Sequence, residues 1–292
     1  MADIAIIDIG SNTMVLKIYD ETGKEKDNGY YSIAAHLVSY IKDGVMEHAG
    51  MEAALAVLQK YRAILEERDI TEVHGFITEP WRHIANADEL FSVLARSGFA
   101  IEGLSGEEEA LYDFLGSRLD TADIRNGNMF DIGGGSAELV SFKDGKLTAS
   151  YSMPIGCLRL KTMPVERSVA DPFLKEAFEA EPALLDTPNP VIIGSGGTCR
   201  AVMMMLEEEE RNRPYTKERL EQLFQRLFEQ EETAAALMNR VVTPDRRDVI
   251  VPGFNLVLAI MDAFHSEEIR FSNYGVREGY LFEKVINGAS KK

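Results

Sequence analysis

Two stretches of the chain share one pattern of apolar and polar positions. The first covers residues 4–19 and the second residues 128–142, and each contains an apolar run that reaches an aspartate, Asp8 or Asp131, shortly before glycine and small polar residues interrupt it. Short apolar runs bounded by turn residues are typical of buried strands. Each stretch is therefore predicted to form a strand, a tight turn and a second strand.

The chemistry of these turns suits a phosphate group and its metal ion. Glycine lets backbone N–H groups approach an anion closely, and an aspartate at the end of a strand can reach a metal. Alternatively, the turns are ordinary hairpins whose glycines only supply positive φ angles. The two aspartates lie 123 residues apart (131 minus 8). This repeat favours the first interpretation and suggests duplicated halves that face each other across a ligand-binding cleft.

The rest of the chain alternates between strand and helix patterns. A third glycine-rich strand end, residues 191–198, opens a helix whose first N–H groups either bind an anion or simply begin the helix. Further strands are predicted at residues 73–77 and 99–104. Helices are predicted at residues 49–68, 87–97, 105–119, 172–180, 199–211, 216–229, 231–240 and 248–264, with a last one that ends at about residue 286.

Composition limits the class of protein. With 292 residues, 45% hydrophobic and 27% charged, the chain can bury a sizeable core and is expected to be a soluble two-domain protein. A net charge of −17 argues against a nucleic-acid partner bound through the bulk surface. The N-terminus has the acidic Asp3 and the chain has no long apolar run, so no membrane is expected and the cytoplasm is the predicted location. Cys157 and Cys199 are interpreted as packing residues.

Three glycine-rich strand ends, two of which follow an aspartate, resemble the actin-like and sugar-kinase-like fold. That resemblance implies an α/β architecture of two ribonuclease-H-like domains around an interdomain cleft. More narrowly, the chain resembles the exopolyphosphatase and guanosine pentaphosphate phosphatase family in its short two-domain form. The resemblance covers nearly the whole chain and rests on motifs in the family's order, at residues 8–13, 105–110, 131–138, 155–160, 194–198 and 275–279. It implies a first domain at 1–120, on which helix 277–287 packs, and a second at 121–276.

The resemblance also implies catalytic roles. In the family, the second glutamate of a Glu-Glu-Ala step activates water, and this position is Glu109, with its neighbour Glu108 as the alternative. A carboxylate can do this because it accepts a proton from water and orients the water for attack on phosphorus. Arg82 matches an arginine that could clamp phosphate oxygens in a bidentate way. Without the resemblance, Arg82 would be interpreted as part of a surface ion pair.

The same resemblance implies a Mg²⁺ site and a phosphate site. Asp131 would hold Mg²⁺, and Asp8 and Glu138 would be further carboxylates close to the metal or its water. Asp131 and Glu138 thereby join Glu109 and Arg82 as expected catalytic residues. The phosphates would be bound by Gly10, Ser11, Asn12, Thr13, Gly133, Gly134, Gly135, Ser136, Gly196 and Gly197.

Two stretches depart from the family pattern. Residues 77–82 place Glu79 and Trp81 beside Arg82, where the family has Ala-Thr-(Ser/Ala)-Ala-(Leu/Phe)-Arg, and residues 36–44 lack its Arg-Leu-Gly-Glu-Gly-Leu pattern. Both departures leave the expected catalytic residues unchanged. They therefore bear on the length and identity of the substrate and not on the type of reaction.

The predicted function is that of a Mg²⁺-dependent phosphoanhydride hydrolase that releases terminal phosphate from inorganic polyphosphate. The alternatives are a guanosine pentaphosphate phosphohydrolase and a weakly active regulator that binds nucleotide or polyphosphate. An actin-like ATPase or small-molecule kinase is disfavoured by the surroundings of Glu109. The expected partner is an anionic small molecule or polymer, and the sequence is compatible with a homodimer.

Overall fold

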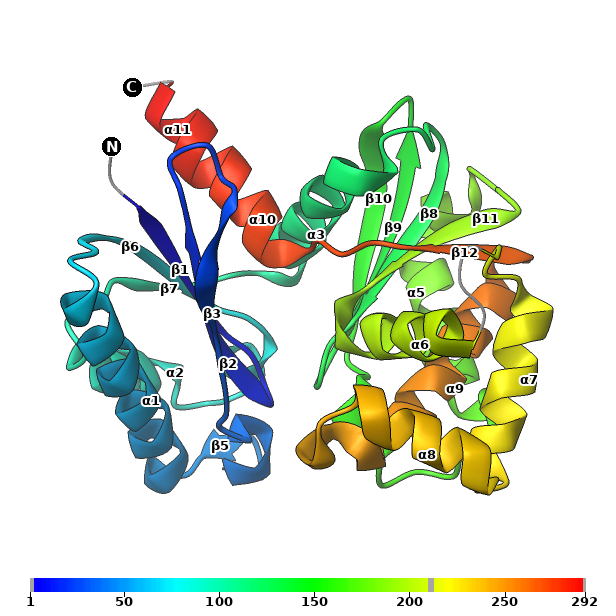
Figure 1. Ribbon diagram of the computed structural model, residues 1–292, viewed down its shortest axis with the longest axis horizontal. Coiled ribbons are helices and arrows are strands. Elements are labelled where there is room, and N and C mark those ends of the chain that lie inside the picture. Colours follow the sequence, from blue (N-terminus) through cyan, green and yellow to red (C-terminus); the bar gives the residue numbers. More distant parts are fainter. Residues whose placement is uncertain (1–2, 210–212, 291–292) are drawn as a thin grey trace. The chain divides into compact units, whose positions relative to one another are not determined.

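The computed structural model describes residues 3–209 and 213–290 (Figure 1). It divides into two compact units, one formed by Met1–Glu109 together with Arg277–Lys292 and the other by Ala110–Val276. The chain therefore leaves the first unit once and returns to it after completing the second.

The first unit is built on a five-stranded sheet with the strand order β3-β2-β1-β6-β7. The central strand β1 pairs antiparallel with β2 and parallel with β6. The strands are β1 (Ile4–Ile9), β2 (Thr13–Tyr19), β3 (Glu25–Ala34), β6 (Glu72–Ile77) and β7 (Ile101–Gly103). The sequence did not predict β3, because this strand begins with four exposed polar residues and has no run of apolar positions.

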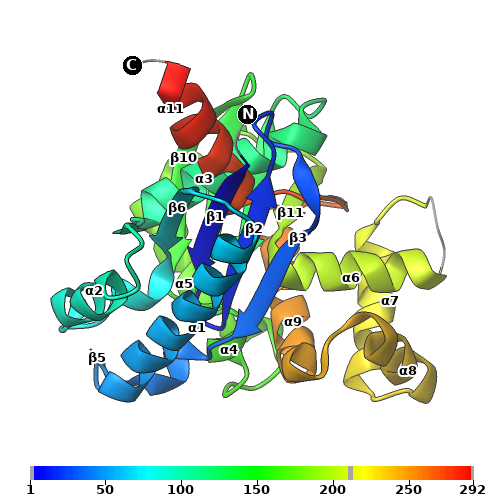
Figure 2. The same ribbon diagram turned by 60° about the vertical axis from the view of Figure 1, so that its left-hand side comes forward.

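Strand β1 is buried on both faces of this sheet. Ala5, Ile7 and Ile9 pack in one core with the helices α1 (His48–Glu67) and α2 (Ala87–Ala95), which Figure 2 shows beside the strands. Successive side chains of a strand point to opposite faces, so Asp8 points away from this core. Four short elements complete this part: η1 (Leu37–Tyr40), β4 (Ile41–Lys42), β5 (Val45–Met46) and η2 (Glu79–Trp81).

The C-terminal helices pack on the other face of the first sheet. They are α10 (Val276–Tyr280), η6 (Leu281–Ile286) and α11 (Asn287–Ser290). The ring of Tyr280 lies 4.8 Å from the ring of Phe76 on β6, between centroids. Tyr280 and Lys284 both bind the carboxylate of Glu102 on β7. These contacts tie the two separate segments of the first unit together.

The second unit repeats the topology of the first. Its sheet has the order β10-β9-β8-β11-β12, and the central strand β8 pairs antiparallel with β9 and parallel with β11. The strands are β8 (Gly127–Ile132), β9 (Ala137–Lys143), β10 (Lys146–Met153), β11 (Val191–Ser195) and β12 (Glu268–Phe271). The predicted strand, turn and strand are thus present in both units.

Helices cover both faces of the second sheet. Phe130 and Ile132 on β8 pack in the larger core, which includes α6 and α9, whereas Met129 packs with Ala110 and Phe114 of α3. The α-helices are α3 (Gly106–Thr121), α4 (Cys157–Leu160), α5 (Asp171–Ala180), α6 (Gly196–Glu209), α7 (Lys217–Phe228), α8 (Glu232–Val241) and α9 (Arg247–Ala263). Shorter helical turns are η3 (Arg167–Val169), η4 (Pro182–Leu185) and η5 (Pro244–Arg246).

Most predicted helices lie within two residues of the observed ones. One exception is α6, which begins at Gly196 and not at Cys199; its predicted end at Arg211 lies outside the described residues. The other is the last helix, which continues as α11 to Ser290 and not only to about residue 286. No helix in the described ranges is both long enough and apolar enough to span a membrane.

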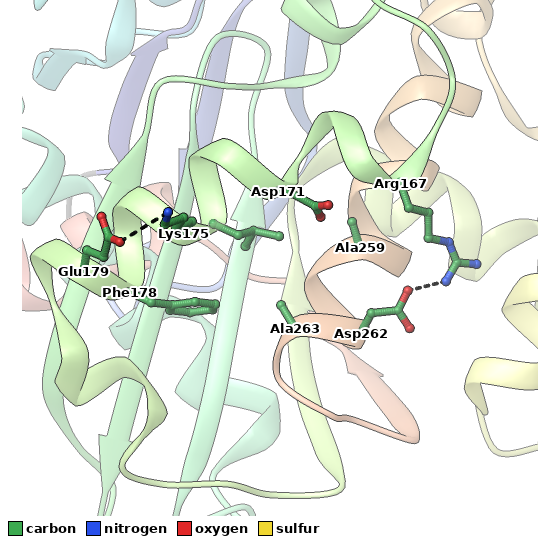
Figure 3. Close-up of a pocket in the computed structure, with 9 residues that line it drawn as sticks. Arg167, Asp171, Lys175, Phe178, Glu179, Ala259, Asp262 and Ala263 are labelled. Atoms are coloured by element: carbon green, nitrogen blue, oxygen red, sulfur yellow. Dashed lines mark hydrogen bonds and ion pairs between the residues drawn. The ribbon is translucent and has the colours of Figure 1, made fainter.

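A surface cavity of about 540 Å³ lies between α5 and α9 of the second unit. Leu174, Phe178 and Ala259 contribute apolar surface to it, and Arg167 and Asp262 form an ion pair at its edge (Figure 3). Its lining contains none of the residues predicted to bind phosphate or metal.

Candidate active site

The N-terminal turn of α3 separates the two glutamates that the sequence left as alternatives. The Glu108 N–H donates to Ser105 Oγ at 3.1 Å, and the Ser105 N–H donates to Glu108 Oε2 at 2.9 Å. This reciprocal pair is a capping box, which satisfies N–H groups that have no partner inside the helix. Glu108 is exposed, whereas Glu109 is only 8% exposed. Glu108 therefore caps the helix, whereas Glu109 is the buried glutamate of the two.

Glu109 forms an ion pair with Arg82 within the first unit. Arg82 Nη1 lies 2.6 Å from Glu109 Oε2, and each side chain is 11% exposed. Arg82 directly follows η2, and its N–H donates to the Glu79 carbonyl at 3.0 Å. The arginine and the glutamate for which the resemblance implied separate roles are thus in direct contact.

Trp81 does not project beside Arg82 as a substrate-facing ring. Its indole N–H donates to the Leu104 carbonyl at 3.2 Å, and its ring lies 5.8 Å from that of Phe91. A side-chain carbon on Gly103 would lie 2.7 Å from the indole. This departure from the family pattern is therefore accommodated by packing inside the first unit.

Two predicted carboxylates lie side by side on the second sheet. Asp131 and Glu138 are direct partners in the pairing of β8 with β9, so their side chains share one face. Ser195 Oγ donates to Asp131 Oδ2 at 2.5 Å, and Ser152 Oγ donates to Glu138 Oε1 at 2.9 Å. Both carboxylates thus accept hydrogen bonds from hydroxyl groups of the second unit.

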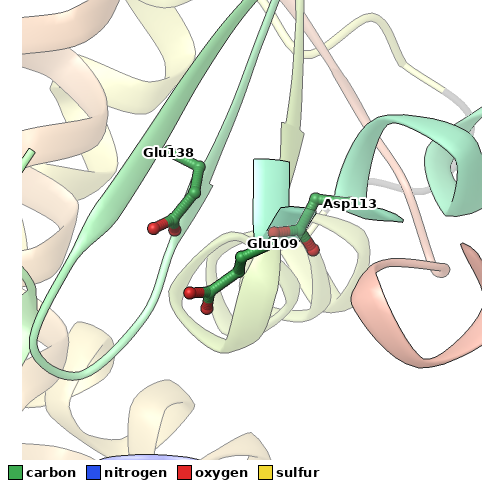
Figure 4. Close-up of side chains that lie close together, drawn as sticks. All are labelled: Glu109, Asp113 and Glu138. Atoms are coloured by element: carbon green, nitrogen blue, oxygen red, sulfur yellow. The ribbon is translucent and has the colours of Figure 1, made fainter. Parts of the chain in front are cut away.

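A third acidic residue joins this group and was not predicted. Asp113 lies one turn after Glu109 on α3, is 3% exposed, and offers an oxygen that lies within 4.8 Å of oxygens of Glu109 and Glu138 (Figure 4). Gly275 adjoins it: a side-chain carbon there would lie 3.2 Å from Asp113 Oδ1 and 3.8 Å from Asp131 Oδ2. Carboxylate oxygens are the ligands that hard divalent cations prefer, so this cluster could hold one.

The backbone of the second turn is oriented by α4. The Gly133 N–H donates to the Ser136 carbonyl at 3.0 Å, which closes the turn. The Gly133 and Gly134 carbonyls accept from the first N–H groups of α4 at 3.1 and 2.9 Å. Because C=O and N–H point in opposite directions across a trans peptide, the N–H groups of Gly134 and Gly135 point away from α4. Neither has an acceptor among the residues that the structure describes.

The first turn is held in a similar way. The Gly10 N–H donates to the Thr13 carbonyl at 3.1 Å. The carbonyls of Ser11 and Asn12 accept from N–H groups of the segment 35–38 at 2.8 to 3.0 Å. By the same argument, the N–H groups of Asn12 and Thr13 point away from that segment.

Asp8 meets a charged partner within the first unit. Arg277 Nη1 lies 2.7 Å from Asp8 Oδ2, and Glu278 accepts from Lys17 at 2.8 Å and from the Tyr19 hydroxyl at 2.7 Å. Burial alone would lower the pKa of Arg277, but the Asp8 and Glu278 carboxylates outweigh it and raise that pKa. Arg277 therefore stays charged and compensates the Asp8 carboxylate.

The third glycine-rich turn adds a cation that the sequence did not reveal. A side-chain carbon on Gly197 would lie 2.0 Å from Arg246 Nη2, so the Arg246 guanidinium lies directly against the first turn of α6. Helix N-termini and guanidinium groups both favour anions. Arg246 lies outside the motifs, and only the fold brings it to Gly197.

The two cysteines have no catalytic environment. Both are buried, and burial raises the pKa of Cys157 and holds that of Cys199 well above its ordinary value. A thiol must ionise to act as a nucleophile. Their interpretation as packing residues agrees with these surroundings.

Comparisons with known proteins find the same fold. The model of the family described as Ppx/GppA phosphatase matches residues 36–287. A Haemophilus influenzae protein provisionally named an exopolyphosphatase is 24% identical over 98% of this chain and 92% of its own length. A Cytophaga hutchinsonii exopolyphosphatase structure matches with a TM-score of 0.84 and 23% identity over 98% of both chains. An Aquifex aeolicus family member matches with a TM-score of 0.77 and 24% identity, again over 98% of both chains. The predicted fold class is confirmed.

Proposed function

This chain belongs to the Ppx/GppA phosphatase family, and on that premise we propose that it releases terminal phosphate from inorganic polyphosphate. The observation that carries the proposal is the buried Glu109, paired with Arg82 at 2.6 Å. A base and a phosphate-binding cation in direct contact are suited to a reaction that needs both at one phosphorus atom.

Glu109 is proposed to accept the proton of the attacking water. Its carboxylate orients the water for in-line attack on the terminal phosphorus, and the proton moves to a carboxylate oxygen as the new P–O bond forms. The bond from this phosphorus to the bridging oxygen breaks, and the shortened polyphosphate leaves with that oxygen and its electron pair. Arg82 compensates the Glu109 charge before substrate binds. An arriving phosphate competes for the guanidinium, which then stabilises the charge on the phosphate oxygens while Glu109 turns to water.

Phosphate binding is proposed to use backbone N–H groups of the three glycine-rich turns. The Gly10 and Gly133 N–H groups close their own turns, so the following N–H groups, such as those of Gly134 and Gly135, are the better donors. Gly196, Gly197 and the Arg246 guanidinium would bind further oxygens. The remaining candidates are Ser11, Asn12, Thr13 and Ser136.

The acidic residues fit a Mg²⁺ ion. Glu109, Asp113 and Glu138 offer carboxylate oxygens within 4.8 Å of one another, and Mg²⁺ prefers oxygen ligands. Asp131 is the strand partner of Glu138, and we propose that it also binds the ion; hydroxyl groups of Ser195 and Ser152 hold these two carboxylates. A bound Mg²⁺ would neutralise phosphate oxygens on which charge develops. Asp8 is engaged by Arg277 and would act beside the metal only through its second oxygen.

Glu109→Gln tests the proposal. We expect at least a thousandfold loss of phosphate release from polyphosphate, with binding of the polymer retained, because the amide keeps the size of the side chain but cannot accept the proton. Glu108→Gln, which removes only an exposed capping charge, is the matched control and should keep near-normal activity. Full activity of Glu109→Gln would exclude Glu109 as the base.

Guanosine pentaphosphate is the second candidate substrate, because the family's description covers phosphatases of both types. Phosphate release measured from polyphosphate, guanosine pentaphosphate and ATP, with Mg²⁺ and with EDTA, would rank them. Binding without turnover of any of them would favour the weakly active regulator. We also propose that the first domain covers residues 1–120 with helix 277–287, that the second covers residues 121–276, and that the protein acts in the cytoplasm.

A further inference from the structure

Glu79 reaches from η2 to the first glycine-rich turn. Ser11 Oγ lies 2.7 Å from Glu79 Oε2, and the two residues are 5% and 2% exposed. They are 68 positions apart in the sequence.

The hydrogen bond decides how Ser11 can interact with a ligand. A serine hydroxyl has one proton, and an ionised carboxylate can only accept. The Ser11 proton is therefore given to Glu79, and Ser11 Oγ can only accept from a further group. An ionised phosphate oxygen also only accepts, so it finds no donor at the Ser11 side chain.

Charge acts in the same direction. A phosphate oxygen in contact with Ser11 Oγ, at about 2.8 Å, would lie at most about 5.5 Å from Glu79 Oε2. Two negative charges at this separation repel each other, so the Glu79 carboxylate opposes a phosphate oxygen at this position.

We propose that Glu79 is a specificity-determining residue of the phosphate site. It takes the Ser11 proton and keeps phosphate oxygens away from the Ser11 side chain, which is left to accept from a donor such as water or a hydroxyl group. The inference rests on the proposed function, since it treats the first turn as part of the phosphate site.

Glu79→Gln is the direct test, because glutamine keeps the shape of the side chain, removes its charge and lets Ser11 act as a donor. We expect the Kd for tripolyphosphate, measured by calorimetry, and the KM for polyphosphate to fall at least tenfold, with kcat changed less than threefold. Glu72→Gln on β6, an exposed glutamate, is the control and should change neither. Unchanged or higher values in Glu79→Gln would overturn the proposal.

Two further measurements keep the test decisive. If Glu79→Gln melts at a much lower temperature, Glu79→Ser, the residue of the family pattern, replaces it with the same expectation. In a Ser11→Ala background, the gain from Glu79→Gln should be at least threefold smaller, and an identical gain would contradict the role of the Ser11 proton. Lack of wild-type turnover would count against the proposed function alone, whereas equal tripolyphosphate binding by wild type and Glu79→Gln would count against Glu79. Failure of both proteins to bind would overturn both proposals.

Discussion

The two glycine-rich hairpins have the same backbone but hold their aspartates differently. In each, the first glycine N–H closes the turn and neighbouring carbonyls are held by another segment. Asp8 pairs with the Arg277 guanidinium at 2.7 Å, whereas Asp131 accepts a hydrogen bond from the Ser195 hydroxyl at 2.5 Å. The repeated topology has thus kept the geometry of both turns, while the two aspartates have different contacts.

The largest expected effect is the difference in the free energy of unfolding between substitutions of the two aspartates. Asp8→Asn should lower the free energy of unfolding by about 3–5 kcal/mol, because it leaves the buried Arg277 without its counter-charge. Asp131→Asn should cost no more than about 1 kcal/mol, since an amide oxygen can still accept from Ser195, yet it should abolish phosphate release. Urea unfolding and a phosphate assay measure both. Equal losses of stability would show that the two sites do not differ as proposed.

A second control isolates the charge. Replacing both partners, Asp8→Asn with Arg277→Met, should recover part of the stability lost in Asp8→Asn alone, because no uncompensated charge remains buried.

An intermediate effect is expected at Gly196, which lies close to the Asp131 carboxylate. The first unit has no glycine at the corresponding place, where Thr78 follows β6. Its φ is +89°, and an added side-chain carbon would lie 2.8 Å from Asp131 Oδ1. Gly196→Ala should cost about 1–3 kcal/mol of stability and most of the activity. Gly145→Ala is the matched control: it has φ +72° but its nearest atom is 3.9 Å away, so it should lose only about 1 kcal/mol and no activity. Equal activity losses in both variants would contradict the steric argument.

The smallest expected effect tests whether the backbones of the Gly10 and Gly133 turns are equivalent. A side-chain carbon would lie 3.1 Å from the Thr13 carbonyl oxygen in Gly10→Ala and 3.3 Å from the Ser136 carbonyl oxygen in Gly133→Ala. Each substitution should cost less than about 1 kcal/mol, and the two costs should agree within about 0.5 kcal/mol. Thermal unfolding measures both, and a clear difference between them would mean that the backbones are not equivalent.

Local patterns predicted the frame of the molecule well. Both hairpins, the third glycine-rich turn and most helices follow from short apolar runs and their turn residues, which act through neighbouring positions. Strand β3 was missed because most of it is exposed, and its place in the sheet comes from pairing with β2 and not from a run of apolar residues. Asp113 could have been found from its four-residue spacing to Glu109, since such residues share one face of a helix.

Long-range contacts account for the partners of the site residues that could not be predicted from the sequence. The Glu79–Ser11 hydrogen bond spans 68 positions and the Arg277–Asp8 ion pair spans 269. Arg246 reaches Gly197 only because η5 packs beside α6. The sequence has no local signal for such partners, so the resemblance supplied residue roles but not their ionic surroundings.

The split first unit has a consequence for biosynthesis. A ribosome adds about 5–20 residues per second, so Asp8 emerges roughly 15 s to 1 min before Arg277, 269 positions later. During that interval the first sheet lacks the helices that cover one of its faces and the cation that compensates Asp8. The second unit, whose segments are contiguous, can fold while synthesis is still under way. Completion of the first-synthesised unit therefore has to wait until the segment from Arg277 onward has been made.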